Sequence, residues 1–189
     1  MPYLTSKLQG FGTTIFGEMS ALALATNSVN LGQGFPDTDG PREVLDAAIE
    51  AINTGQNQYP PAIGVPSLRE AIAEHQQRFY GLTFDPVTEV LVTAGSSEGL
   101  ASALLALLDT GDEVITFEPM FDIYQACIAL AGGQVKAITL RPPTYGFDID
   151  EVRAAITPRT KIILVNSPHN PTGKVFNREE LQSIADIAI

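Results

Sequence analysis

The stretch that decides the fold is VLVTAGSSEGLASALLALL, residues 90–108. Its first three residues, 90–92, are all apolar, which is typical of a buried strand. A turn follows at Gly95, Ser96 and Ser97, and an apolar helical segment comes directly after it. A strand, turn and helix in this order direct several backbone N–H groups and the positive end of a helix dipole to one place. The sequence therefore predicts an anion site at this turn, and a phosphate suits it best.

The composition favours a globular protein that binds small molecules. The 189 residues are 44% hydrophobic, which is enough for one domain with a real core, or for little more than one. A net charge of −11 argues against a nucleic-acid surface, and dispersed Lys and Arg argue against an anionic membrane as partner. The sequence has neither a signal-peptide pattern nor an apolar run of ~18 residues. Cys127 is the single cysteine, so we expect no disulfide or cysteine metal site, and we expect a cytoplasmic location.

An alternation of strand and helix patterns begins at residue 89. Strand-like segments lie at 89–93, 113–117, 134–139 and 161–165, and helical segments lie between them at 98–108, 123–131 and 149–156. This order predicts an α/β fold with a mostly parallel sheet and flanking helices.

The part of the chain before residue 89 is mainly helical in pattern. Helices are expected over 13–26, 41–53 and 67–80, the last with a capping box of Ser67 and Glu70. A short strand is expected at Asn30. A final helix is predicted to begin after Asn177, with Glu180 completing a second capping box.

Three loops follow predicted strands, at 95–97, 118–124 and 166–173, and parallel sheets bind ligands at such loops. The first also fits the pattern G-x-S-x-G, so a serine hydrolase with Ser97 as nucleophile is an alternative. His169 is the only histidine after Ser97 in the sequence and would have to be its base. A purely structural turn is a further alternative.

The other two loops carry candidate binding residues. Phe121 and Tyr124 lie three residues apart at a helix start, and they are either a core pair or an aromatic face for a flat ring. In the third loop, two prolines bracket Asn170 and fix its path, so its amide can donate a hydrogen bond to a phenolate-type oxygen. His169 lacks neighbouring His or Cys residues that would complete a metal site, and no metal is expected.

The three loops, in this order, resemble those of the class I/II aminotransferases among the fold type I pyridoxal-phosphate enzymes. The resemblance rests on five motifs along nearly the whole chain: NLGQGFPD, NQYPPAIGVPSLREAIA, VLVTAGSSEGL, GDEVITFEPMFDIY and NSPHNPTGKVFNREEL. The kynurenine/glutamine aminotransferases and the N-succinyldiaminopimelate aminotransferases of actinobacteria are the most similar subgroups.

The resemblance implies pyridoxal 5'-phosphate as cofactor and an amino acid and a 2-oxo acid as substrates. Gly95, Ser96 and Ser97 would hold the cofactor phosphate, Phe121 would stack on the pyridine ring, and Asn170 would bond its 3-oxygen. Gly34, together with Asn170, would contact the substrate carboxylate. Tyr59 would reach the phosphate of a neighbouring subunit, which implies a homodimer with shared sites. Cis peptide bonds are also expected before Pro119 and Pro171.

The family's Schiff-base lysine, ring-nitrogen acid and substrate-binding arginine are expected beyond residue 189. The chain is therefore interpreted as a truncated, inactive N-terminal part. Residues 1–40 would form an arm and a small-domain segment, and residues 41–189 the first part of the large domain. A C–S β-lyase of the same fold is an alternative to the aminotransferase. The sequence does not identify the amino donor.

Overall fold

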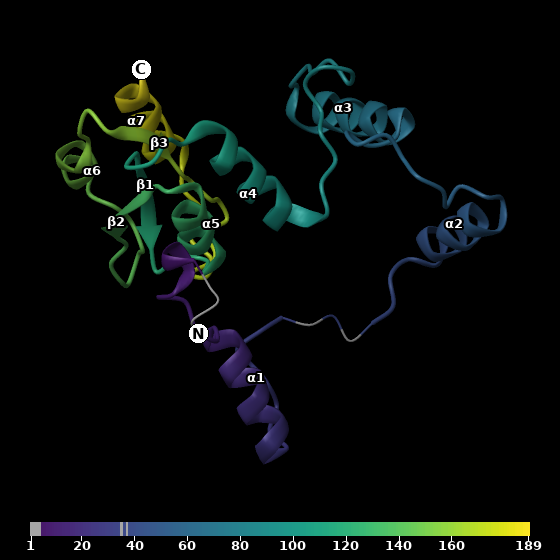
Figure 1. Cartoon of the computed structure of the whole chain (residues 1–189), viewed down its shortest axis with the longest axis horizontal. Coiled ribbons are helices and arrows are strands. Elements are labelled where there is room, and N and C mark those ends of the chain that lie inside the picture. The colour runs from purple at the N-terminus through teal and green to yellow at the C-terminus, as the bar shows by residue number, and fades with distance from the viewer. Residues whose placement is uncertain (1–4, 35, 37) are drawn as a thin grey trace. The chain divides into compact units, whose positions relative to one another are not determined.

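The computed structural model describes residues 5–34, 36 and 38–189 (Figure 1). The chain forms two compact units. The first consists of residues 1–12 and 95–189, and the second of residues 13–94. None of the described helices is long and apolar enough to cross a membrane.

The first unit is built around a three-stranded parallel sheet. The strand order is β2-β1-β3, so β1 is central and pairs with both neighbours. Its elements alternate along the chain as α4 (Gly95–Leu107), β1 (Glu113–Glu118), α5 (Ile123–Ala131), β2 (Gln134–Thr139), α6 (Ile149–Ala155), β3 (Thr160–Ile163) and α7 (Arg178–Ala188). The predicted α/β class is confirmed, and the predicted bounds of β2 and α5 agree with the observed ones.

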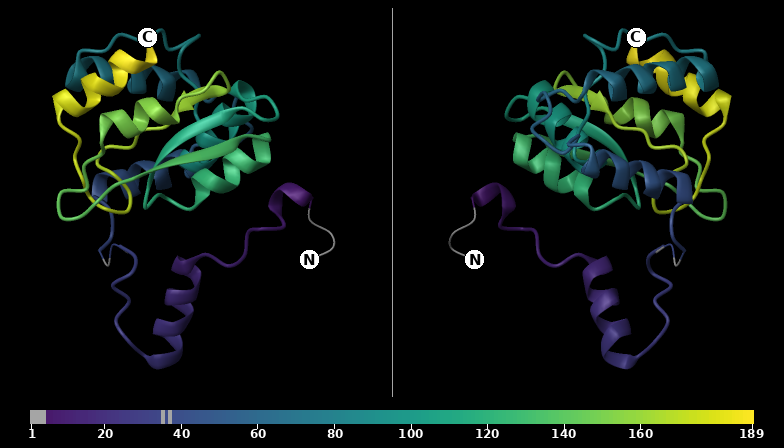
Figure 2. Two further views of the ribbon diagram at one scale, coloured as in Figure 1. Left: turned by 90° about the vertical axis from the view of Figure 1, so that its left-hand side faces the viewer. Right: turned by 90° about the vertical axis from the view of Figure 1, so that its right-hand side faces the viewer.

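Helices cover both faces of this sheet, as Figure 2 shows for α5 on one side and α6 and α7 on the other. Successive side chains of a strand point to opposite faces. Val114 therefore packs with Leu104 of α4 and Ile128 of α5, in one of two buried clusters. Its neighbour Ile115 belongs to the other cluster, with residues of α6 and α7. β1 is buried on both faces, which explains why apolar residues (Val114, Ile115 and Phe117) face both clusters.

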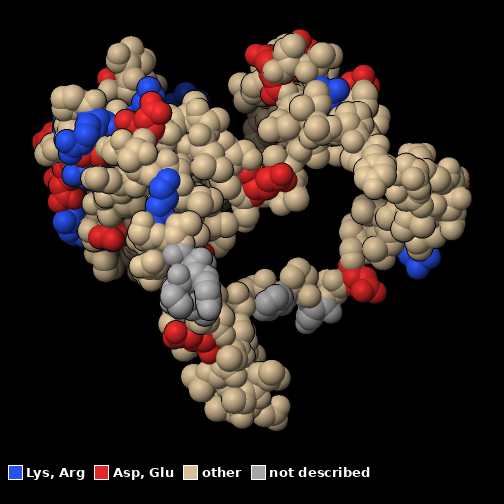
Figure 3. All heavy atoms as spheres, viewed as in Figure 1, with Lys and Arg blue, Asp and Glu red and all other residues tan. Residues whose placement is uncertain are grey.

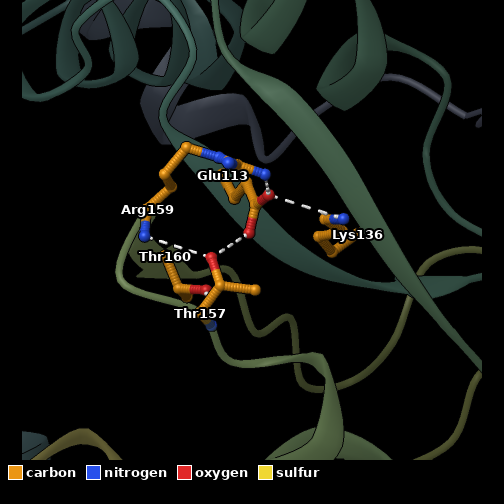
Figure 4. A network of polar contacts seen from close by, with 5 residues as sticks. All are labelled: Glu113, Lys136, Thr157, Arg159 and Thr160. Carbon is orange, nitrogen blue, oxygen red and sulfur yellow. Dashed lines mark hydrogen bonds and ion pairs between the residues drawn. The ribbon is translucent and has the colours of Figure 1, made fainter.

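A buried carboxylate joins the amino-terminal ends of the three strands (Figure 4). Glu113, the first residue of β1, has no exposed surface. It accepts hydrogen bonds of 2.6 Å from Thr157 Oγ1 and 2.6 Å from Arg159 Nη2, and Lys136 Nζ of β2 lies 3.4 Å away. The Thr157 hydrogen bond, aided by the Arg159 and Lys136 charges and opposed by burial, lowers the pKa of Glu113 to about 2. The strand ends are thereby held together at the edge opposite to the loops that follow the strands.

The N-terminal segment of the first unit is attached to α5. This segment contains the short 3-10 helix η1 (Ser6–Leu8). Within η1, Lys7 Nζ donates a 3.1 Å hydrogen bond to the carbonyl of Leu130. This carbonyl belongs to the last turn of α5, where a cation also interacts favourably with the helix dipole.

The second unit is helical, with α1 (Ile15–Thr26), α2 (Arg42–Asn53) and α3 (Pro66–Tyr80). α1 and α2 have no buried residues, whereas α3 buries Arg69. The guanidinium of Arg69 donates to the carbonyls of Pro86 and Val87 at 2.9 and 3.2 Å. It thereby joins α3 to the segment that follows it.

The prediction of a strand at residues 89–93 is wrong. Among the described residues the sheet consists of β1, β2 and β3, and residues 90–93 belong to no strand. Val92 donates its N–H to the carbonyl of Ile63 at 3.2 Å, and Leu91 is more than half exposed. An apolar sequence becomes a strand only when a neighbouring strand pairs with it.

Two smaller predictions are also wrong. The short strand at Asn30 is absent, because the Asn30 side chain accepts from the Gly32 N–H at 2.9 Å and turns the chain there. The capping box of Ser67 is absent, because α3 begins at Pro66 and its N-cap is Val65. Proline is well suited to the first helical position, so Ser67 lies inside the helix. The capping box of Asn177 and Glu180 on α7 is confirmed.

Candidate functional site

The candidate site lies at the carboxyl-terminal edge of β1 and β3. These two strands pair in parallel, so the loops that follow them leave the sheet on the same side. The loop after β1 carries Phe121 and the loop after β3 carries Asn170. Within the first unit, the sequence-predicted residues of both loops therefore lie at neighbouring strand ends.

The loop after β1 presents a partly exposed aromatic ring that packs against a buried one. Phe121 is partly exposed, and Tyr124 beneath it is buried. Their ring centroids are 5.7 Å apart at an interplanar angle of 88°, an edge-to-face pair. Burial raises the pKa of the Tyr124 hydroxyl. Tyr124 thus belongs to the core, while Phe121 retains surface that a flat ligand can cover.

The loop after β3 presents an amide without a protein partner. Asn170 is exposed, and within the described part of the chain its side chain makes no hydrogen bond. Its backbone N–H donates to Asn166 Oδ1 at 2.8 Å, which fixes the backbone of the residue. Asn166, for which the sequence indicates no role, therefore holds the backbone of Asn170 in place.

The peptide bonds before Pro119 and Pro171 are both cis, as expected. The structure has two further cis bonds, before Pro143 and Pro168.

His169 is engaged inside the protein. Its side chain is 4% exposed, its Nδ1 lies 2.9 Å from Thr172 Oγ1, and its ring centroid lies 6.0 Å from that of Phe176. Burial lowers the pKa of His169, and the Phe117 backbone partly offsets this effect. A histidine held in this way cannot serve as the base of Ser97, which argues against the serine hydrolase. The described residues contain no group of three or more His, Cys, Asp or Glu that could hold a metal ion.

The turn at residues 95–97 forms the first turn of α4. Gly95 has φ +78°, a conformation that L side chains rarely adopt, and Ser96 and Ser97 are exposed. α4 has 13 residues and therefore spans about 20 Å, similar to a six-residue strand. α4 packs into the buried cluster on the α5 side of the sheet through Ala101 and Leu104, whereas its first turn is exposed.

Gly34 and Tyr59 belong to the second unit. Tyr59 is fully exposed, and Gly34 is exposed in a loop whose residues Phe35 and Asp37 lie outside the described part. Their assigned roles involve groups beyond that unit, so they stay predictions.

Three of the four lysines are engaged in contacts that serve the fold. Lys7 binds the Leu130 carbonyl, Lys136 lies beside Glu113, and Lys174 forms a 2.9 Å ion pair with Glu180. Lys161 lies in β3. Charged side chains of both signs are interspersed on the face shown in Figure 3, so the basic ones form no separate patch there.

Comparison with known proteins decides the family. The model of the family described as aminotransferase class I and II matches residues 26–188. The chain belongs to this family. It is 50% identical over 186 residues to the probable N-succinyldiaminopimelate aminotransferase of Mycobacterium tuberculosis, covering 97% of this chain and 47% of that protein. It is 45% identical over 179 residues to the methionine aminotransferase of Escherichia coli K12, covering 95% and 46%.

Solved structures of aminotransferases have the same fold. The N-succinyldiaminopimelate aminotransferase of M. tuberculosis superimposes with a TM-score of 0.93 at 49% identity, over 98% of this chain and 49% of that one. An aspartate aminotransferase of Thermus thermophilus gives a TM-score of 0.89 at 38% identity. The fold is therefore that of fold type I aminotransferases, and the chain spans about half the length of the relatives it matches.

Proposed function

We propose that this chain contributes the first part of the active site of a pyridoxal-phosphate-dependent aminotransferase. The whole protein would transfer an amino group from an amino acid to a 2-oxo acid. The observation that carries the proposal is the exposed Asn170 amide, which has no protein partner and lies one strand away from the partly exposed ring of Phe121. Membership of the aminotransferase family supports the same assignment.

The residues present fit the cofactor. The start of α4 offers the exposed hydroxyls of Ser96 and Ser97 and the positive end of the helix dipole, which suit a dianionic phosphate. Phe121 offers a flat apolar face to a pyridine ring. The Asn170 amide offers a hydrogen-bond donor to an anionic ring oxygen. When bound, pyridoxal phosphate supplies an electron sink for the bond changes at the amino acid α-carbon.

In this proposal the chain binds and orients the reactants and does not supply the covalent anchor. The amide of Asn170 would hold the ring oxygen and stabilise its deprotonated form. The resemblance assigns Gly34 and Asn170 to the substrate carboxylate. The resemblance to the family implies that the amine that holds the aldehyde would come from outside these 189 residues. We further infer a cytoplasmic homodimer in which Tyr59 reaches the partner's phosphate site.

The phosphate assignment can be tested by adding a negative charge at two equivalent helix positions. Ser96 is the second residue of α4, and Ser67 is the second residue of α3. Both are exposed. Aspartate is tolerated at either position because it interacts favourably with the helix dipole. Only at the phosphate site does it repel the cofactor.

The experiment uses the natural protein and measures its binding of pyridoxal phosphate by visible absorbance. Ser96→Asp should weaken binding by about tenfold or more, corresponding to ~1.4 kcal/mol, while Ser67→Asp leaves it unchanged. Equal affinities of both variants would contradict the phosphate site. A wild-type protein that binds no pyridoxal phosphate, or binds it without amino-group transfer from any amino acid, would contradict the proposed function.

A further inference from the structure

Asn166 lies where the sheet passes into the loop that carries Asn170. Leu164, one residue beyond the end of β3, still donates its N–H to the carbonyl of Ile115 in β1 at 2.8 Å. Asn166 follows two residues later and is partly buried. The loop therefore starts from a backbone that the central strand holds in place.

The side chain of Asn166 reaches forward into this loop. Its Oδ1 accepts a hydrogen bond of 2.8 Å from the backbone N–H of Asn170, four residues further along the chain. A side chain of this kind takes the place of a backbone acceptor in a turn. The bond therefore connects the position directly after the sheet to the residue that presents the free amide.

Few other groups could hold the backbone of Asn170. Residues 168 and 171 are prolines, which have no N–H, so the segment 168–171 has only the backbone donors of His169 and Asn170. The N–H of His169 donates forward, to the Lys174 carbonyl at 2.8 Å. The N–H of Asn170 is thus the one backbone donor of this segment that bonds back toward β3.

The position of the backbone decides what the Asn170 amide can reach. With the backbone fixed, only the two side-chain torsions of Asn170 remain to be set. A binding group has to lie within ~0.5 Å of its productive position, because a hydrogen bond weakens quickly outside its narrow range of distances and angles. A backbone shift of ~1 Å at Asn170 would therefore lose the contact with a bound ligand.

We propose that Asn166 is a positioning residue that holds the Asn170 amide where it donates to the ligand's ring oxygen. This inference rests on the proposed function. In this role Asn166 acts through the backbone of Asn170, and the Asn170 amide makes the contact with the ligand.

The test uses Asn166→Ala, Asn166→Asp and Asn170→Ala in the natural protein, with Asn177→Ala as matched control. Alanine removes the acceptor, whereas aspartate keeps an oxygen acceptor on a side chain of nearly the same shape. Asn177 belongs to the same unit, and its Oδ1 also accepts a backbone N–H at 2.8 Å, that of Glu180 at the start of α7. The control therefore loses the same kind of bond at another place.

The first readout is amide hydrogen exchange without cofactor. Exchange of the Asn170 N–H should become about tenfold faster in Asn166→Ala, because this N–H loses its acceptor. Asn166→Asp should restore exchange to within about twofold of the wild type. Asn177→Ala should accelerate exchange of the Glu180 N–H and leave that of Asn170 unchanged.

The second readout is the pH titration of the visible absorbance with pyridoxal phosphate bound. A hydrogen bond to an anionic oxygen favours its deprotonated form, so Asn170→Ala should raise the titration midpoint by about one pH unit. Asn166→Ala should raise it too, and the double variant should add nothing to Asn170→Ala alone. If Asn166 only stabilised the fold, its replacement would lower the unfolding temperature, as Asn177→Ala does, without moving the midpoint.

Unchanged exchange of the Asn170 N–H in Asn166→Ala would overturn the inference. So would an unchanged midpoint in Asn166→Ala when Asn170→Ala shifts it. An unchanged midpoint in Asn170→Ala, or a wild-type protein that does not bind pyridoxal phosphate, would contradict the proposed function and the inference with it. These last two results are distinguishable because neither depends on a change at Asn166.

Discussion

Replacing Phe176 with alanine should destabilise the first unit strongly. Phe176 is 3% exposed and packs at the face of the sheet that α6 and α7 cover. Its ring centroid lies 5.9 Å from Phe117, 5.6 Å from Phe147 and 6.0 Å from His169. The side chain therefore supports both the end of β1 and the loop that carries Asn170.

The magnitude follows from burial and ring contacts. Truncating a buried phenylalanine to alanine typically costs ~3–5 kcal/mol, through lost transfer free energy and the cavity left behind. Phe176→Leu keeps most of the apolar volume and loses mainly the contacts with Phe117 and Phe147. Each such aromatic pair is worth ~0.5–1.5 kcal/mol beyond area burial. We therefore expect Phe176→Leu to cost roughly 1–3 kcal/mol.

The assay is urea unfolding followed by circular dichroism, with Phe79→Ala as the control. Phe79 on α3 is 61% exposed, so its truncation should cost about 1 kcal/mol or less. The slopes of the unfolding transitions should stay equal, which would show that stability and not compactness has changed. Equal destabilisation by Phe176→Ala and Phe79→Ala would refute the assignment of the first unit's core.

Three further predictions concern Glu113, Asn177 and Cys127. Because the folded pKa of Glu113 is about 2 and its ordinary value 4.5, its carboxylate stabilises the fold above pH 4.5 and this stabilisation is lost toward pH 2. Glu113→Gln should therefore destabilise the protein at pH 7. When it unfolds between pH 2 and 4.5, the variant should take up about one proton fewer than the wild type does. Asn177→Ala should cost ~1 kcal/mol through loss of the α7 cap. Cys127, 6% exposed and with a pKa raised by burial, should react with thiol reagents only after unfolding.

Each of these three predictions would be contradicted by a specific result. Parallel stability curves of wild type and Glu113→Gln between pH 2 and 4.5 would show that the carboxylate is not held as described. Asn177→Ser should retain most of the stability, since a serine hydroxyl also caps; a loss equal to that of Asn177→Ala would contradict the capping role. Rapid labelling of Cys127 in the native protein, at the rate of a small thiol, would contradict its burial.

Local patterns were sufficient for the elements that pack within the first unit. The bounds of α5 and β2 follow from their apolar periodicity and from the two glycines, Gly132 and Gly133, that separate them. Residues 89–93 have an equally apolar pattern and do not form a strand, because pairing is decided by residues distant in sequence. Ser67 shows a similar limit, since one preceding proline moved the start of α3.

The candidate site could likewise be predicted only in part from local sequence. The sequence identified Phe121 and Asn170, and the structure adds why they are available, through the core ring of Tyr124 and the unpartnered amide. The burial of His169 could not be predicted, because apolar periodicity does not indicate when a histidine lies in the core. The pairing of Glu113 with Arg159 could not be predicted either, because it joins positions 46 residues apart.

The most direct test of the account is a crystal structure of the protein, as its organism makes it, with pyridoxal phosphate bound. We predict that the phosphate accepts hydrogen bonds from the first turn of α4, that Phe121 covers one face of the ring, and that the Asn170 amide lies within ~3 Å of the ring oxygen. A cofactor bound elsewhere, or bound with the Asn170 amide turned away from the ring, would contradict it.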